Sequence, residues 1–274
     1  MAAAMALTSK FGISDCQTRW ESRLNRAREL QRQYPAAAAL LRFYETILGF
    51  QRELASDFKA SVRPGVGLRQ QIDVTVASLG VPSILALADK YGPEALRLHA
   101  RNLRQAGETS WKKILDSALV GGQDLSAFDS FFARACLQPI AENLQTQLPA
   151  DANYGKNVCP ACGGFAQLAV LRPEGEGASR WLLCSFCLRE WVFRRIVCPW
   201  CGEEDKEKLP RYSAAECGHV LVEGCDTCQK YLKAVDMTID GHAEPLVDEA
   251  ALAVLDVWAA DHGYTKIVQN LIGF

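Results

Sequence analysis

Eleven cysteines are present in this chain of 274 residues, and nine of them lie between Cys159 and Cys228. Eight of the nine form four Cys-x-x-Cys pairs: Cys159/Cys162, Cys184/Cys187, Cys198/Cys201 and Cys225/Cys228. A thiolate is a soft ligand for zinc or iron, and a two-residue gap lets the chain turn so that both thiolates reach one ion. This segment is therefore a candidate metal-binding region.

The four pairs form two matching units. The first and third pairs share the motif Cys-Pro-x-Cys-Gly and lie 39 residues apart, while the second and fourth lie 41 apart. The spacer between the two pairs of a unit is 21 residues in the first unit and 23 in the second. This spacing is typical of zinc ribbons and rubredoxins.

The repeat predicts two four-cysteine sites. Site 1 is expected to consist of Cys159, Cys162, Cys184 and Cys187, and site 2 of Cys198, Cys201, Cys225 and Cys228. An interleaved arrangement, with Cys159 and Cys225 on one ion, is the main alternative. Sequential pairing is favoured because interleaving must close longer loops, which costs more chain entropy.

A four-sulfur site has no open position for water or substrate, so its role is structural or electron-carrying. Structural zinc contributes on the order of 10 kcal/mol, which can replace the core that a module of about 40 residues lacks. We therefore expect metal loss to unfold such a module. Iron and zinc are both compatible with tetrahedral thiolate ligands, and the spacing does not distinguish them.

Other uses of paired cysteines fit the pattern less well. The apolar stretch at residues 1–7 is too short for a secretion signal, so we expect a reducing, cytoplasmic environment that disfavours disulfides. A thioredoxin-type redox motif occurs as one pair at the start of a helix, not as two matching units. Metal ligation is the better interpretation.

The remaining cysteines and histidines form no motif. Eight matched cysteines suffice for two ions, so Cys217 and His219 are expected to pack or face solvent. Cys16 and Cys136, both in the part expected to be helical, are expected to be inert buried thiols. No Ser/His/Asp arrangement, paired carboxylates or phosphate-binding loop nominates a catalytic residue, so we expect the chain not to be an enzyme.

Residues 1–150 are expected to form a helical domain. Apolar residues recur at three- and four-residue spacing from Leu40 to Leu54 and from Phe128 to Ile140. Together with proline and glycine at the expected helix starts and stops, this pattern predicts about six or seven helices. A loop-forming stretch then marks a domain boundary near residue 151.

The cysteine-rich part is expected to fold as two small modules, residues 151–194 and 195–247. Short apolar runs bounded by the pairs favour strands. These runs are Phe165–Leu171, Arg180–Leu183, Glu190–Phe193 and His219–Val222. Helical spacing over 248–260 predicts a helix in the C-terminal segment 248–274. The fold class is therefore α+β: an N-terminal all-α domain, two rubredoxin- or zinc-ribbon-like β modules and a C-terminal helix.

Composition and charge exclude several function classes. Apolar residues make up 49% of the chain and charged residues 23%, which is typical of a globular protein. No apolar run is long enough for a membrane span, so membrane insertion is not expected. The formal net charge is -2, and residues 156–233 hold 11 basic and 10 acidic side chains, so nucleic-acid binding is disfavoured.

These features resemble the FdhE family, accessory proteins of bacterial formate dehydrogenase. Segments outside the pairs carry much of the resemblance. Cys136–Glu142 resembles the end of the family's helical domain, and Cys225–Asp236 resembles its last pair with a Tyr-Leu-Lys sequel. Tyr34–Tyr44 and Gln51 are similar to its early helices. The resemblance extends from about residue 20 to the C-terminus.

The resemblance implies a cytoplasmic protein with two rubredoxin-like modules, which bind iron and contact the catalytic subunit of formate dehydrogenase during maturation. The first hypothesis is therefore a non-catalytic accessory protein whose metal-stabilised platform holds that subunit. The alternative is a rubredoxin-like electron carrier with iron in its four-cysteine sites. A zinc-ribbon nucleic-acid-binding protein is the third.

Four aromatic side chains lie near the pairs: Trp181, Trp191, Trp200 and Tyr231. Exposed aromatic residues often anchor a protein partner. Aromatic residues beside a metal knuckle also shield the thiolates from water. The solvent exposure of each aromatic side chain therefore decides whether it anchors a partner or shields the thiolates.

Overall fold

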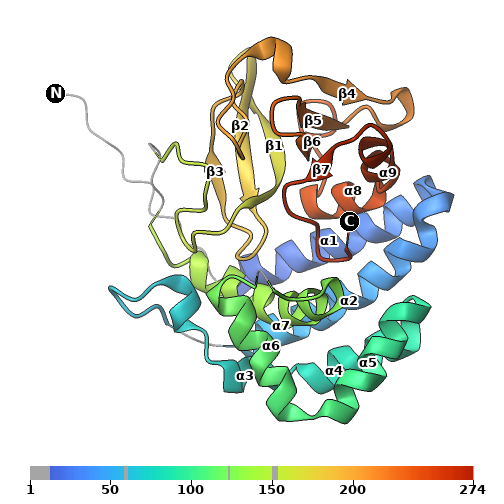
Figure 1. Cartoon of the computed structure of the whole chain (residues 1–274), viewed down its shortest axis with the longest axis vertical. Helices are drawn as coiled ribbons and strands as arrows, with labels where there is room; N and C mark the ends of the chain where they lie inside the picture. The colour runs from blue at the N-terminus through green and yellow to red at the C-terminus, as the bar shows by residue number, and fades with distance from the viewer. Residues whose placement is uncertain (1–12, 59–60, 123, 150–153, 274) are drawn as a thin grey trace.

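The N-terminal part of the chain is helical, as predicted. The computed structural model describes residues 13–58, 61–122, 124–149 and 154–273. Its seven helices before residue 150 are α1 (Ile13–Gln33), α2 (Ala38–Asp57), α3 (Val74–Ser78), α4 (Val81–Tyr91), α5 (Glu94–Ala106), α6 (Glu108–Val120) and α7 (Ala127–Gln145). Short 3-10 helices lie at Pro35–Ala37 and Leu68–Gln71. Figure 1 shows these helices packed against one another in the lower half of the molecule.

Local signals account for several helix ends. Ser126 is the N-cap of α7, and its hydroxyl accepts a hydrogen bond from the Asp129 N–H. Gly107 ends α5 with a φ of 77°, a conformation that glycine adopts without steric cost. Gly92 follows α4 as its C-cap. The predicted capping residues thus lie at helix boundaries.

The cysteine-rich part forms one mixed sheet. Its strands are β1 (Ala166–Glu174), β2 (Gly177–Cys184), β3 (Glu190–Val192), β4 (Arg211–Ser213), β5 (Val220–Cys225), β6 (Lys230–Asp236) and β7 (Thr265–Lys266). The order across the sheet is β3-β2-β1-β6-β5-β4, with β7 paired to β6. Strands β1 and β2 form a hairpin whose two-residue turn includes Gly175 at a φ of 56°.

The two units meet at a parallel strand pair. β1–β3 belong to the first unit and β4–β6 to the second, and Leu168–Leu171 of β1 pairs in parallel with Lys233–Asp236 of β6. The sheet therefore continues across the predicted boundary at residue 195. The division into separate modules remains a prediction, whereas the α+β fold class is confirmed.

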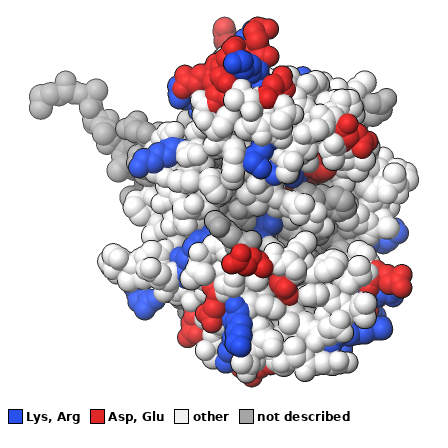
Figure 2. Space-filling view, viewed as in Figure 1, with Lys and Arg blue, Asp and Glu red and all other residues white. Residues whose placement is uncertain are grey.

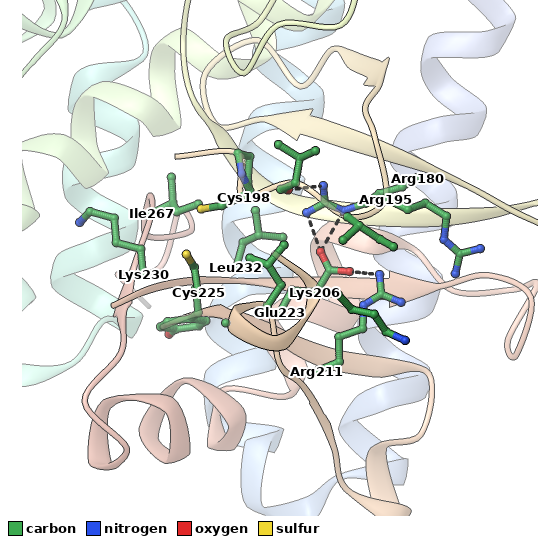
Figure 3. Close-up of a pocket in the computed structure, with 16 residues that line it drawn as sticks. Arg180, Arg195, Cys198, Lys206, Arg211, Glu223, Cys225, Lys230, Leu232 and Ile267 are labelled. Atoms are coloured by element: carbon green, nitrogen blue, oxygen red, sulfur yellow. Dashed lines mark hydrogen bonds and ion pairs between the residues drawn. The ribbon is translucent and has the colours of Figure 1, made fainter. Parts of the chain in front are cut away.

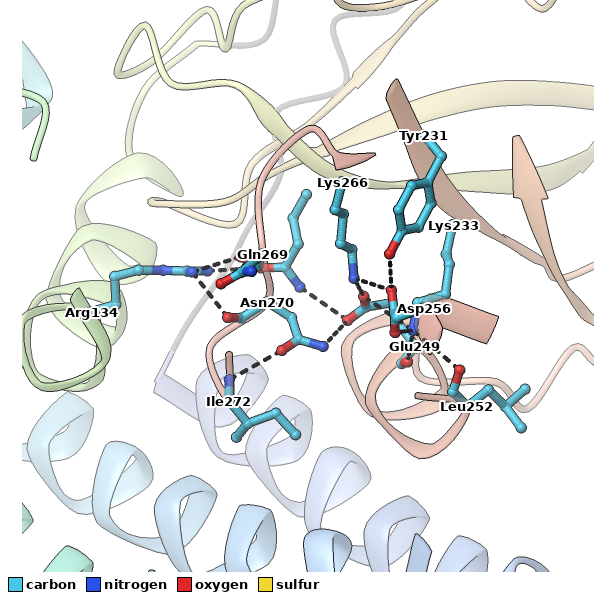
Figure 4. A network of polar contacts seen from close by, with 11 residues as sticks. Arg134, Tyr231, Lys233, Glu249, Leu252, Asp256, Lys266, Gln269, Asn270 and Ile272 are labelled. Carbon is cyan, nitrogen blue, oxygen red and sulfur yellow. Dashed lines mark hydrogen bonds and ion pairs between the residues drawn. The ribbon is translucent and has the colours of Figure 1, made fainter. Parts of the chain in front are cut away.

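The C-terminal segment contains two short helices, α8 (Pro245–Ala251) and α9 (Val254–Asp261), where one was expected. The reason lies in the buried Lys233 of β6. Its ammonium group donates to the carbonyl oxygens of Glu249 and Leu252 and pairs with the carboxylate of Asp256. Figure 4 shows Lys233 joined to its partners by these contacts, which satisfy carbonyl oxygens near the end of α8.

The helical part and the first cysteine unit share one hydrophobic core. Leu137 of α7 belongs to the same buried cluster as Leu182 and Cys184 of β2. Across this junction the Gln138 side chain donates to the Ser185 carbonyl oxygen at 3.0 Å. Packing in the helical part and around the first unit is therefore coupled.

No helix in the described ranges combines the length and apolar character that crossing a lipid bilayer requires.

Candidate metal centres

The structure brings the cysteines together in two clusters of four. Within each cluster the sulfur atoms all lie within 4.8 Å of one another. One cluster holds Cys159, Cys162, Cys184 and Cys187, and the other holds Cys198, Cys201, Cys225 and Cys228. The grouping is sequential, not interleaved.

In site 1, the Cys159 and Cys187 sulfur atoms are 3.5 Å apart, and those of Cys162 and Cys184 are 3.4 Å apart. A disulfide bond would require about 2.05 Å. A tetrahedral ion with metal–sulfur bonds of about 2.3 Å places its sulfur ligands about 3.8 Å apart. The cluster therefore has the dimensions of a metal site and not of a disulfide.

Site 2 has the same dimensions. The sulfur atoms of Cys198 and Cys228 are 3.8 Å apart, and those of Cys201 and Cys225 are 3.6 Å apart. Each cluster consists of four thiols and includes neither a carboxylate nor a histidine. Such a donor set suits zinc or iron and would leave no coordination position for a substrate.

All four knuckles have the same backbone turn. The residue after the second cysteine of each pair has a positive φ: 72° at Gly163, 57° at Leu188, 80° at Gly202 and 55° at Gln229. This turn directs the sulfur atoms of both cysteines of a pair toward the centre of their cluster. Glycine takes the conformation freely, whereas Leu188 and Gln229 adopt it at a cost of about 1 kcal/mol each.

Backbone N–H groups point at the sulfurs. The Phe186 N–H donates to Cys184 Sγ and the Trp200 N–H to Cys198 Sγ, both at 3.4 Å. Such donors stabilise thiolates without adding a competing charge. Hydrogen bonds from the other thiols, and then from the Gly164 N–H, lower the pKa of Cys162.

Site 1 also contacts the helical part directly. Arg69, from the 3-10 helix Leu68–Gln71, donates from Nε to the Cys162 carbonyl oxygen at 3.1 Å and from Nη1 to the Ala118 carbonyl oxygen at 2.8 Å. Its guanidinium lies 4.1 Å from the ring centroid of Phe186, inside the second knuckle. The sequence analysis did not identify Arg69 as a residue that contacts site 1.

The two sites differ in exposure. At site 1, Cys159, Cys184 and Cys187 are buried and Cys162 is partly buried, whereas at site 2 Cys201 is exposed and Cys228 is partly buried. The difference arises because the helical part covers the first unit. A chelator or partner can therefore approach site 2 more readily.

Comparisons with known proteins agree with this geometry. Residues 158–195 match the model of the FdhE central domain, and residues 196–272 match that of the FdhE C-terminal domain. The crystal structure of the FdhE protein from Pseudomonas aeruginosa superposes with a TM-score of 0.73 at 26% identity, covering 93% of this chain and 96% of that one. The chain is therefore similar to FdhE proteins in sequence and in fold.

Curated FdhE homologues show the same relationship. The homologue from Aquifex aeolicus is 24% identical over 273 residues, which covers 93% of this chain and 95% of that protein. The homologue from Pseudomonas aeruginosa is 36% identical over 124 residues, or 43% of this chain and 40% of that protein. The similarity to FdhE proteins thus includes the helical part as well as the two cysteine units.

The four aromatic residues near the pairs have different roles. Trp191 is buried in the core cluster that contains Cys184, which fits a shielding role. Tyr231 is buried and donates to Asp256 at 2.8 Å, so it belongs to the charged network around Lys233. Trp200 is 38% exposed and is available to a partner. Trp181 is partly buried and donates to the Ser179 hydroxyl.

His219 packs as expected, in a buried ion network. Its Nε2 lies 2.7 Å from Asp248 Oδ1, and Asp240 completes a group with metal-site dimensions. Arg26 already contacts both carboxylates, at 2.6 Å each. A resident guanidinium makes this group a protein ion cluster rather than a third metal centre.

Three cysteines remain outside the eight, and the two whose side chains the structure describes, Cys136 and Cys217, belong to neither cluster. Cys136 is fully buried in the helical core, and desolvation raises the pKa of its thiol to about 12. It is therefore inert, as expected. Cys217 is buried in the packing of the second unit. The side chain of Cys16 lies outside the described residues.

Proposed function

We propose that the chain is a non-catalytic accessory protein for formate dehydrogenase maturation, which binds the catalytic subunit through a platform stabilised by two metal ions. Similarity to FdhE proteins supports the connection with formate dehydrogenase. The observation that carries the proposal is the pair of closed four-sulfur clusters set in one continuous sheet. A metal ion bound in such a cluster stabilises the fold that presents the surface, but it has no coordination position left for formate.

Site 1 would be held by Cys159, Cys162, Cys184 and Cys187, and site 2 by Cys198, Cys201, Cys225 and Cys228. A bound ion would neutralise the charge of the four thiolates and would cross-link the two knuckles of its site. The resemblance to the FdhE family favours iron, while the four thiols accept zinc equally well. We place the protein in the cytoplasm, where cofactor-containing dehydrogenases are assembled and thiols stay reduced.

The decisive experiment combines binding with activity. Cells lacking the protein should lose formate dehydrogenase activity, and the purified protein should not oxidise formate. Tagged wild-type protein should capture the catalytic subunit, whereas a Cys184→Ser/Cys225→Ser double variant should not. Cys136→Ala, which removes a thiol outside both clusters, is the matched control. Failure of the wild-type protein to capture any formate dehydrogenase subunit would overturn the proposal.

The exposure of site 2 favours one second candidate, an electron carrier. Cys201 is exposed beside the half-exposed Trp200, so an iron ion there would lie close to a docked redox partner. Zinc-loaded protein distinguishes the two functions because zinc has no redox chemistry. Zinc-loaded protein that binds the subunit and restores activity supports the platform; zinc-loaded protein that binds without restoring activity supports electron transfer.

A further inference from the structure

A cavity of about 430 Å³ lies between the two cysteine units, within the size range of ligand-binding pockets. Its walls come from β2, β5 and β6 and from the chain that connects site 2 to β4. Two ligands of site 2, Cys198 and Cys225, line it. Figure 3 shows both sulfur atoms and Lys230 at one side of the cavity, and the other charged side chains toward the opposite side.

The cavity is lined by five cations and one carboxylate. The cations are Arg180, Arg195, Lys206, Arg211 and Lys230, and the carboxylate is Glu223. Glu223 already pairs with Arg180 at 2.6 Å and with Arg211. Within the part of the chain that the structure describes, Arg195, Lys206 and Lys230 have no carboxylate partner. This is a local positive site in a chain whose formal net charge is -2.

The site also has an apolar component. Ile196, which is 50% exposed, and Leu232 line the cavity. At its rim the Trp200 and Phe165 rings lie 4.9 Å apart, and the Lys230 ammonium lies 4.7 Å from the Trp200 ring centroid. Phe165 comes from the first unit and Trp200 from the second, so this exposed aromatic pair bridges the two units. Solvent-accessible aromatic residues next to a pocket are typical of binding hot spots.

Cations and exposed apolar groups recognise different parts of a ligand. An inorganic anion would pair with the cations but would leave Ile196 and Trp200 uncovered. An apolar ligand without charge would leave three unpaired cations facing it, which costs desolvation energy. An extended peptide with alternating acidic and apolar side chains satisfies both components, because its alternate side chains can enter the cavity and cover the rim.

We propose that this cavity binds an extended acidic peptide segment that carries apolar side chains and belongs to the protein partner. The carboxylates pair with Arg195, Lys206 and Lys230, and an apolar side chain packs on Ile196 and Trp200. The identity of that partner as a formate dehydrogenase subunit rests on the proposed function. Figure 2 shows acidic side chains gathered with a few basic ones at the top of the face in view, and no broad basic surface on that face.

The direct test uses a fluorescein-labelled peptide of alternating Asp and Leu residues and measures its anisotropy with the metal-loaded full chain. Arg195→Glu/Lys206→Glu should weaken binding by at least about tenfold, since both contacts become repulsive. The matched control is Arg97→Glu/Lys113→Glu, which reverses two exposed cations of the helical part and should bind like wild type. Equal metal content and circular dichroism establish that all variants are folded.

A second variant tests the apolar contact. Ile196→Ser should weaken peptide binding without changing its salt dependence, because no charge is altered. A peptide of alternating Ser and Leu should bind at least about tenfold more weakly than the acidic peptide. The proposal is overturned by no binding of the acidic peptide, by equal binding to the charge-reversed variant, or by full displacement with an equal concentration of inorganic phosphate.

Capture of the dehydrogenase subunit separates this inference from the proposed function. If wild-type protein and the charge-reversed variant capture the subunit equally, the cavity is not its docking site, although the accessory function stands. If wild-type protein captures no subunit, the accessory function fails, and the peptide titration still decides whether the cavity binds acidic segments. If wild-type protein captures the subunit and the charge-reversed variant does not, the result supports both the accessory function and the binding role of the cavity.

Discussion

Arg26 of α1 and Asp248 of α8 form a buried ion pair, with Nη2 and Oδ1 2.6 Å apart. The two residues are 222 positions apart in the sequence, so the pair fastens the helical part to the C-terminal segment that covers the sheet. Asp248 Oδ2 also accepts from the Glu244 N–H at 2.8 Å, at the start of α8. The carboxylate thus both caps a helix and holds a cation from another part of the chain.

Replacing Asp248 with Asn should lower the free energy of unfolding by about 3 to 5 kcal/mol, because Arg26 remains buried without its main partner. Urea denaturation followed by circular dichroism measures the change. Glu21→Gln is the control: it breaks an exposed pair with Arg52 and should cost less than about 1 kcal/mol. Equal effects of the two substitutions would contradict a stabilising role for the buried pair.

Gly164→Ala should weaken metal binding at site 1 only. A Cβ atom at this position would lie 3.3 Å from both the Cys162 and Cys184 sulfur atoms and 3.4 Å from Arg69 Nη2. The knuckle would have to open to admit a methyl group. Competition with a chelator measures the affinity of each site. Gly155→Ala, which meets nothing within 4 Å, should leave both sites unchanged.

Metal should leave site 2 before site 1. Cys201 is exposed, whereas Cys184 and Cys187 are fully buried beneath the helical part. A coloured chelator should therefore record two phases of equal amplitude. Cys225→Ser should abolish the fast phase, and Cys184→Ser should abolish the slow one. A single phase that releases both ions together would show that the sites open as one unit.

Protonation of Glu142 at acid pH should lower the free energy of unfolding. Burial alone would raise the pKa of this carboxyl group, but Arg23 and Arg19 outweigh burial and hold its pKa below the ordinary 4.5. A lowered folded-state pKa gives stabilisation that is present above about pH 4.5 and is lost as the pH falls through the folded-state value.

The variant Glu142→Gln isolates this contribution from acid-induced metal loss, which affects wild type and variant alike. The difference in unfolding free energy between wild type and Glu142→Gln should be largest near pH 6 and should shrink toward about pH 3. Urea denaturation at several pH values measures it. A difference that stays constant over this range would mean that the carboxylate charge does not stabilise the fold.

The sequence predicted most of the local structure. Helical periodicity predicted the N-terminal helices, and short apolar runs predicted β1, β2, β3 and β5, because both patterns depend on neighbouring residues. Strand β6 was not predicted, since its run Lys230–Asp236 contains Lys233, a residue type that is rarely buried. Only the partners Glu249 and Asp256, which are remote in the sequence, make this lysine compatible with a central strand.

The grouping of eight thiols into two clusters followed from spacing alone, because a Cys-x-x-Cys turn is local and a short hairpin brings two pairs together. Tertiary structure decided what distinguishes the clusters. Arg69 reaches site 1 from the helical part, and residues of both cysteine units line a basic cavity beside site 2. Such features depend on contacts between residues distant in the chain, which no local pattern encodes.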